Sequence, residues 1–95
     1  MPAYLVGTIR IVDPEQFGRY AAAVKGLAAR FGGEPVVAGA VGRVIEGGSP
    51  VGERVVVTRF ADAVHAMAYI ECDEYRAAQV LREGAATVEL RLVES

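Results

Sequence analysis

The stretch that decides the fold is YLVGTIRIVDPEQ, residues 4–16. From Tyr4 to Val12 the side chains of Leu5, Ile9 and Ile11 point to one side, and those of the residues that alternate with them point to the other. This period of two predicts a β-strand. A helix start follows directly: Asp13 can cap the first turn, Pro14 fits its first position, and Gln16 stands where a capping box places Glu or Gln. A strand is therefore expected to pass into a helix with almost no loop between them.

The first helix and the segment after it are marked by apolar spacing and by glycines. Apolar side chains recur at helical spacing within residues 14–31, and Gly32-Gly33 supply a stop, so we expect one helix over this range. Residues 35–45 are rich in Val and Gly, which favours a strand. Gly39 and Gly42 would weaken a straight strand, so a bulge or bend is expected near them.

The second half of the chain holds two further strands and a broken helix. Residues 54–60, with three valines at their centre, form the clearest strand. Asp62 can cap the next helix, which is expected to break near Cys72-Asp73 and to continue as a short helix over residues 74–82. Alternation returns over residues 87–93 and predicts the last strand.

The elements follow the order β-α-β-β-α-β, which in a short chain predicts a ferredoxin-like α+β sandwich. Two helical segments then cover one face of a four-stranded antiparallel sheet, and residues 1–95 form a single domain. The first strand is expected to lie between the third and the fourth. The helix-side core is expected to contain Leu5, Ile9, Ile11, Val56, Phe60, Val88, Leu90 and Leu92.

The composition excludes several classes of protein. Ten basic residues against twelve acidic ones give a net charge of -2, so a basic surface for nucleic acid is not expected. One Cys and one His rule out an internal disulfide and the Cys/His zinc patterns, and we expect neither a metal nor a cofactor. The first residues lack the features of a signal peptide, and no apolar run approaches the ~20 residues that span a bilayer. With a single free cysteine, these features favour a cytoplasmic protein.

The sheet face turned away from the helices is expected to carry an apolar patch. By strand parity the patch includes Tyr4, Val6, Val55 and Val57. Such patches on small domains mark interfaces or ligand grooves. We therefore expect a two-fold homodimer packed sheet to sheet, with a wet, charged cavity between the sheets. The alternative is a solvated face with scattered valines.

Short signatures spread over nearly the whole chain resemble one known family. In chain order they are Tyr4, Asp13-Pro14-Glu15, Phe17, Tyr20, Phe31-Gly32-Gly33, Glu46-Gly47, Arg54-Val55-Val56-Val57, Phe60, Ala66, Tyr69, Glu74-Tyr75, Arg82 and Leu92-Val93-Glu94. Together they are similar to the domain of unknown function 1330 family. The resemblance implies a ferredoxin-like fold in its dimeric α/β-barrel form. The wider group of such barrels includes cofactor-independent monooxygenases, lactone isomerases, haem enzymes and ligand-sensing domains, and fold alone does not choose among them.

His65 is the only imidazole and the candidate catalytic residue. On a helix it shares a face with Tyr69 and Cys72, and near neutral pH it can act as a general base. Tyr69 is a candidate ligand-binding residue of a pocket beside that helix. The alternative is an ordinary surface histidine, because the spacing fixes no carboxylate partner for His65.

Arg10, Arg59 and Arg91 are the other candidate ligand-binding residues. Strand parity places all three on the open sheet face, with Glu89 among them. A guanidinium can hold two oxygens of a carboxylate or an enolate at once, so the three predict an anion-binding pocket under the dimer interface. The alternative is an Arg–Glu network across that interface.

Glu74, Tyr75 and Arg82 match the family motif residue by residue. Glu74 can stabilise the start of the last short helix, where a negative charge is favoured. Tyr75 can anchor the same helix through a buried ring and a hydrogen-bonded hydroxyl. These two roles are structural, and the sequence fixes no partner for Arg82.

Two functions remain open. The first is the binding or transformation of a small organic acid or ring compound without a cofactor. The alternative is a non-catalytic ligand-sensing or interaction module whose sheet face serves dimerisation. A cavity of roughly a few hundred Å³ with converging polar groups favours the first, and a sheet face filled by the partner's side chains favours the second.

Overall fold

Four strands form one antiparallel sheet in the computed structural model, which describes residues 1–95. The strands are β1 (Ala3–Ile11), β2 (Glu34–Ala40), β3 (Arg54–Phe60) and β4 (Ala86–Glu94). They lie in the order β2-β3-β1-β4, with β1 paired to β3 and to β4. This is the strand order that the sequence predicts, and it confirms the ferredoxin-like α+β arrangement.

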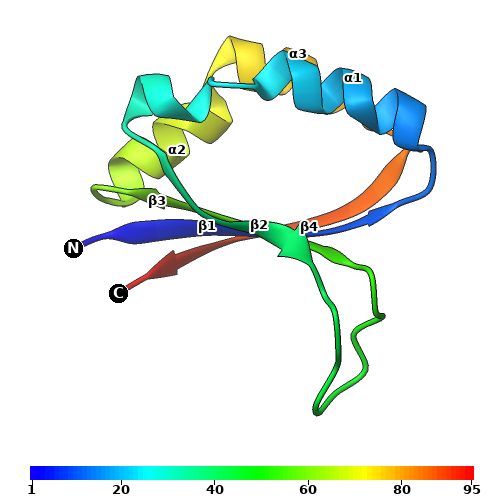
Figure 1. Cartoon of the computed structure of the whole chain (residues 1–95). Helices are drawn as coiled ribbons and strands as arrows, with labels where there is room; N and C mark the ends of the chain where they lie inside the picture. Colours follow the sequence, from blue (N-terminus) through cyan, green and yellow to red (C-terminus); the bar gives the residue numbers. More distant parts are fainter.

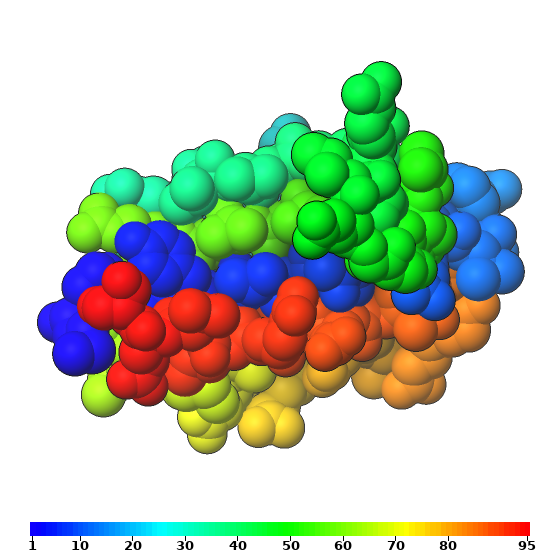
Figure 2. Space-filling model, turned by 90° about the horizontal axis from the view of Figure 1, so that it is seen from below, coloured from blue at the N-terminus to red at the C-terminus, as the bar shows by residue number.

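The helices all lie on one side of the sheet (Figure 1). They are α1 (Pro14–Val24), the short 3-10 helix η1 (Ala28–Phe31), α2 (Ala63–Glu71) and α3 (Asp73–Val80). None of them combines the length and the apolar character that crossing a membrane requires. The other face of the sheet carries no helix, and Figure 2 shows its strands side by side. The chain thus builds two layers and leaves one sheet face bare.

The start of α1 follows the predicted capping only in part. The Asp13 carboxylate accepts a hydrogen bond from the amide of Gln16 at 3.1 Å, as a helix cap does. The Gln16 side chain does not complete a capping box. Its Nε2 donates instead to the carbonyl oxygens of Leu81 at 3.2 Å and Glu83 at 2.8 Å. These bonds tie the start of α1 to the segment that precedes β4.

The first helix is shorter than the sequence predicts. It ends at Val24, and the left-handed backbone of Gly26, with φ of 75°, separates it from η1. The expectation of one helix over residues 14–31 is therefore wrong. Gly32 has φ of 82° and ends η1, which confirms the predicted stop. The predicted break near Cys72 is also confirmed, because extended backbone at that residue separates α2 from α3.

The edge strand β2 is shorter than predicted, and its irregularity lies elsewhere. It ends at Ala40, and the pairing with β3 shifts between Pro35 and Val37 rather than at the glycines. Val36 is the extra residue of this bulge. Proline lacks an amide hydrogen and is tolerated in a sheet at edges and bulges, which explains the position. Residues 41–53 then form an arm that projects away from the helices (Figure 1).

The hydrophobic core occupies only one end of the space between the layers. Its buried cluster is made of Ala3, Leu5, Leu27, Phe60, Ala66, Tyr69 and Tyr75. Helix α1 has no buried residue and packs against α3 rather than down onto the sheet. Three predicted core residues, Ile11, Leu90 and Leu92, therefore remain 36%, 38% and 36% exposed, although they face the helix side. The layers close tightly at α2 and leave a hollow beneath α1 and α3.

Candidate ligand-binding site

The hollow between the two layers is a cavity of about 290 Å³. Its floor is the helix-side face of the sheet, and its roof comes from α1, α2, α3 and the segment after α3. Twelve of its sixteen lining residues are hydrophobic. The lining residues are Leu5, Gly7, Ile9, Phe17, Tyr20, Ala21, Val24, Arg54, Val56, Thr58, Tyr69, Ile70, Tyr75, Arg82, Val88 and Leu90. A mostly apolar hollow with a few polar groups is the usual form of a small-molecule site, and this volume lies at the small end of the range.

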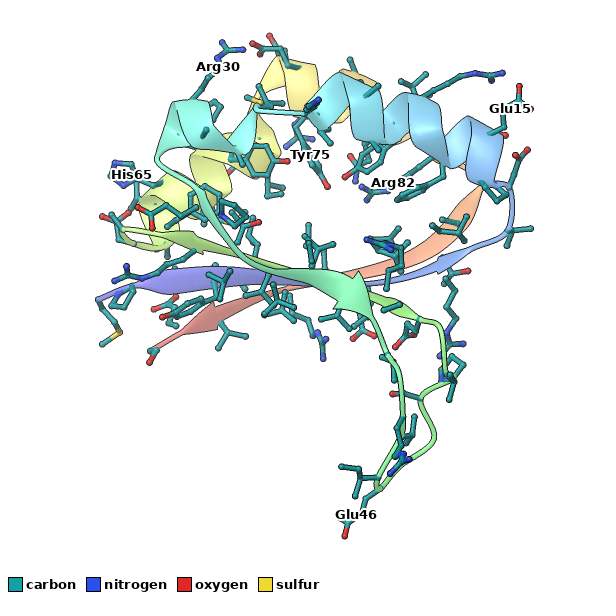
Figure 3. All side chains as sticks on the ribbon, in the orientation of Figure 1. Glu15, Arg30, Glu46, His65, Tyr75 and Arg82 are labelled. Atoms are coloured by element: carbon teal, nitrogen blue, oxygen red, sulfur yellow. The ribbon has the colours of Figure 1, made fainter.

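Three polar side chains converge in the roof, and we call Tyr20, Tyr75 and Arg82 the Tyr–Arg cluster. Nη1 of Arg82 donates a hydrogen bond of 2.9 Å to the hydroxyl of Tyr75, which lies 3.5 Å from the hydroxyl of Tyr20. The guanidinium carbon also stands 4.8 Å from the ring centre of Tyr20. Figure 3 shows Tyr75 and Arg82 in the space between the helix layer and the sheet.

The hydroxyls of two cavity tyrosines stay protonated far above neutral pH. Burial is the main reason that the pKa of Tyr20 lies well above its ordinary value, and the hydrogen bond with Tyr75 adds to it. Burial likewise raises the pKa of Tyr69 to about 12. Both hydroxyls are therefore neutral hydrogen-bond donors under physiological conditions.

Arg82 is a half-buried cation without an anionic partner. Burial by itself lowers the pKa of its guanidinium, but the hydrogen bond to Tyr75 and the nearby tyrosines raise it above the ordinary value. The side chain thus keeps its charge. No carboxylate in the chain forms an ion pair with it. A positive charge beside apolar walls is compensated best by an anion, so the cavity is suited to a negatively charged ligand.

Three polar residues of this cavity, Arg54, Thr58 and Tyr20, were not among the predicted site residues. Arg54 stands on β3 with the same parity as Val56 and Phe60, which face the helices. A charged residue on the core-facing side of a central strand was the signal that could have found it. Tyr20 lies on the apolar stripe of α1, where its hydroxyl gave no separate signal.

The three arginines predicted on the open face lie there, but they do not converge. Arg59 is opposite Tyr4 and Arg91 is opposite Val6, whereas Arg10 lies four residues farther along β1. They stand on the sheet face away from the cavity described above. Their binding of a ligand under a dimer interface stays a prediction.

Two of these arginines contact acidic residues of their own chain. Nε of Arg10 lies 2.9 Å from Oε2 of Glu53, and Nε of Arg91 lies 3.9 Å from Oε1 of Glu89. Both arginines are well exposed, so such pairs stabilise the fold only slightly.

Of the helix candidates, Tyr69 lines the cavity and His65 does not. The ring of Tyr69 stacks on Phe60 at 5.8 Å and meets Tyr75 edge-on at 5.0 Å. His65 is exposed at the outer end of α2 (Figure 3), where its Nδ1 lies 2.6 Å from Oδ1 of Asp62. The hydrogen bond to His65 is the main cause that lowers the pKa of the Asp62 carboxyl. Catalysis by His65 stays a prediction, and it would act outside this cavity.

The family-motif residues divide between the cavity and the surface. Tyr75 and Arg82 belong to the Tyr–Arg cluster, whereas Glu74 lies in the first turn of α3 and pairs with Arg30 at 3.1 Å. Backbone hydrogen bonding at this helix start, followed by the bond to Arg30, lowers the pKa of the Glu74 carboxyl. Glu74 therefore joins α3 to η1 and does not reach the cavity.

A comparison with known protein families matches residues 2–95 to the domain of unknown function DUF1330. The chain belongs to this family. Within this member of the family, the matched region contains every residue of the cavity. The comparison with curated proteins gave no match.

Solved structures of similar fold cover this DUF1330 chain almost completely. A protein of unknown function from Rhodopseudomonas palustris is 18% identical, with 99% of this chain and 82% of that chain covered and a TM-score of 0.76. A dimeric ferredoxin-like protein of unknown function from Jannaschia sp. CCS1 is 17% identical over the whole of both chains, with a TM-score of 0.76. SnoaB, a cofactor-independent oxygenase from Streptomyces nogalater, is 14% identical, with coverage of 99% and 92% and a TM-score of 0.69. At these identities the likeness shows the fold alone.

Proposed function

We propose that this chain binds a small organic acid or ring compound in the cavity, with the anionic group of the ligand at the Tyr–Arg cluster. The main support for this proposal is the environment of Arg82. Its half-buried guanidinium is hydrogen-bonded to Tyr75 and has no carboxylate partner. Its fork can hold both oxygens of a carboxylate. The aromatic and aliphatic walls supply apolar surface for the rest of the ligand.

The lining residues also limit the chemistry that the cavity can perform. They include no Asp, Glu or His, and the hydroxyls of Tyr20 and Tyr69 are protonated at neutral pH. These groups can donate hydrogen bonds to an oxyanion but cannot remove a proton. They therefore favour the transformation of a ligand that is already ionised as an enolate or a phenolate when it binds, so that no proton has to be removed in the cavity and Arg82 stabilises the negative charge. The likeness in fold to SnoaB, a cofactor-independent oxygenase, supports chemistry of this cofactor-free kind.

The test is the affinity for simple organic acids, measured by calorimetry or by protein NMR titration. Arg82→Met should weaken binding by about ten- to a hundredfold, because a hydrogen bond to a charged group is worth about 1.5–3 kcal/mol. Arg76→Met is the matched control, since Arg76 is an exposed arginine on α3 that does not line the cavity. An equal loss of affinity in both variants, or no loss of affinity in either, would show that Arg82 is not the anion site.

We also propose that two copies pack through the bare sheet face. The apolar side chains on that face include Val6 and Val57, which are half-buried, and Val37 and Val93, which are each 46% exposed. A similar fold occurs in a dimeric ferredoxin-like protein from Jannaschia sp. CCS1, which supports the pairing. Light scattering at micromolar concentration should give about twice the chain mass, and the mass of one chain would refute the dimer. A dimer that binds none of the acids would favour the interaction module instead.

A further inference from the structure

The floor of the cavity lacks a side chain at Gly7, although nothing in the fold requires a glycine at this position. Gly7 lies buried in the middle of β1, opposite Val56 on one side and Leu90 on the other, and all three line the cavity. Glycine weakens the interior of a strand and often marks a place where something approaches the backbone closely. The sequence therefore carries a residue here that strand formation disfavours.

Neither crowding nor backbone geometry explains this glycine. A Cβ built at Gly7 would lie 3.5 Å from Cδ1 of Leu90 and 3.7 Å from the carbonyl oxygen of Val56, which are ordinary contacts. Its φ is not positive, so an L-residue would fit the backbone. The missing side chain leaves the backbone of Gly7 as part of the cavity floor, with Cδ1 of Leu90 beside it.

Two guanidiniums enter the same end of the cavity from opposite walls. Arg54 rises from the sheet in the row next to Gly7, where it is opposite Ile9, and Ile9 in turn is opposite Val88. Arg82 comes from the roof side and borders Val88 in the cavity and in an adjoining depression. Neither arginine forms an ion pair with a carboxylate. Two like charges that face one small hollow repel each other, and an anion between them removes that repulsion.

We propose that the cavity holds a flat aromatic carboxylate, with its carboxylate between Arg54 and Arg82 and its ring on the backbone of Gly7. Tyr20 and Tyr75 then cover the other side of the ring. The space is sufficient, because a cavity of about 150 Å³ in another protein admits benzene and this one measures about 290 Å³. This inference rests on the proposed function, since it describes how the same cavity holds its ligand.

The probes are benzoate, 2-naphthoate, cyclohexanecarboxylate and the uncharged analogue benzamide, each titrated against the full chain by calorimetry or NMR. The two aromatic acids should bind, and cyclohexanecarboxylate should bind at least about tenfold more weakly, because a puckered ring cannot lie flat on the backbone. Benzamide should also bind at least about tenfold more weakly than benzoate, because it lacks the negative charge. Equal affinity for benzoate and cyclohexanecarboxylate would overturn the inference while leaving the proposed function intact.

The variants separate the two ideas further. Gly7→Val should keep the melting temperature near that of the wild type and weaken the binding of the aromatic acids by more than about tenfold. Gly7→Ala should weaken their binding less, because its smaller side chain covers less of the backbone. Gly18→Val on the exposed surface of α1 is the control for an added side chain. Arg54→Met should weaken the binding of benzoate by at least about tenfold, as is expected for Arg82→Met.

Three results decide between the alternatives. Wild-type affinity for 2-naphthoate in both Gly7 variants would overturn the inference. Dependence on Arg82 without dependence on Arg54 would overturn it too, while the proposed function stands. Failure of every acid to bind the unaltered chain would overturn both.

Discussion

Raising the pH from about 9 to about 12 should destabilise the protein through its buried tyrosines. Burial raises the pKa of Tyr69 from 10.0 to about 12, and it raises the pKa of Tyr20 as well. In the unfolded chain both hydroxyls lose their protons near their ordinary pKa. Above that point the unfolded state binds fewer protons than the folded state, so the free energy of unfolding falls as the pH rises. The stabilisation is present in full below pH 10 and is lost towards the folded-state pKa.

The size of this effect follows from the shift at Tyr69. Two pKa units at about 1.4 kcal/mol each give an upper bound of about 2.7 kcal/mol. Screening by solvent reduces this value, because Tyr69 is not completely buried, so we expect Tyr69 to account for about 1–2 kcal/mol. Urea unfolding, followed by circular dichroism at several pH values, measures the loss in the wild type and in Tyr69→Phe. The free energy of unfolding of the wild type, measured relative to that of Tyr69→Phe, should fall by this amount as the pH rises.

Phe17→Leu is the control, because Phe17 lines the same cavity as Tyr69 and carries no hydroxyl. Its unfolding free energy should follow that of the wild type as the pH rises. If the unfolding free energy of Tyr69→Phe also stays parallel to that of the wild type up to about pH 12, the folded protein does not hold the hydroxyl of Tyr69 in its protonated form.

Three further substitutions probe the fold and its assembly. Gly33→Ala should destabilise the protein by about 1–3 kcal/mol in thermal unfolding, because a Cβ there would lie 2.9 Å from the Phe60 ring and from the Ala28 carbonyl oxygen; an unchanged melting temperature would contradict this packing. Gln16→Ala removes two hydrogen bonds that hold α1 to the segment before β4, and it should lower the unfolding free energy by about 1–2 kcal/mol in urea titrations. Val57→Glu places a charge on the bare sheet face and should reduce the mass in light scattering to that of one chain; a persistent dimer would place the interface elsewhere.

The alternation of side chains predicted the sheet well because it is a local property. In β1, Leu5 and Ile9 are buried while Val6 and Thr8 face the other way, as the period of two requires. The bulge at Val36 and the end of α1 at Val24 were not predicted. The bulge depends on Pro35 at the edge of the sheet, and the end of α1 depends on the left-handed backbone of Gly26. The periodicity of the sequence indicates neither feature.

The position of the cavity could not be predicted in the same way. Parity shows which face a strand residue occupies, but it does not show how far the helices stand from that face. The sequence pattern therefore assigned Leu90 and Leu92 to a closed core, whereas α1 rests on α3 and leaves them partly exposed. The arginines predicted to bind a ligand were those of the open face. Arg54 was not predicted as a site residue, because a closed apolar core does not accommodate a cation.

The location of bound benzoate in the unaltered chain tests most directly whether the cavity between the sheet and the helices is the ligand site. Isotope-filtered NMR detects protein protons that lie within a few Å of the ligand ring. We predict contacts from the benzoate ring to Tyr20, Tyr75 and Leu90, which line the cavity between the sheet and the helices. Contacts to Val6 and Val57 on the bare sheet face would show that the cavity is not the ligand site and would place that site between two sheets.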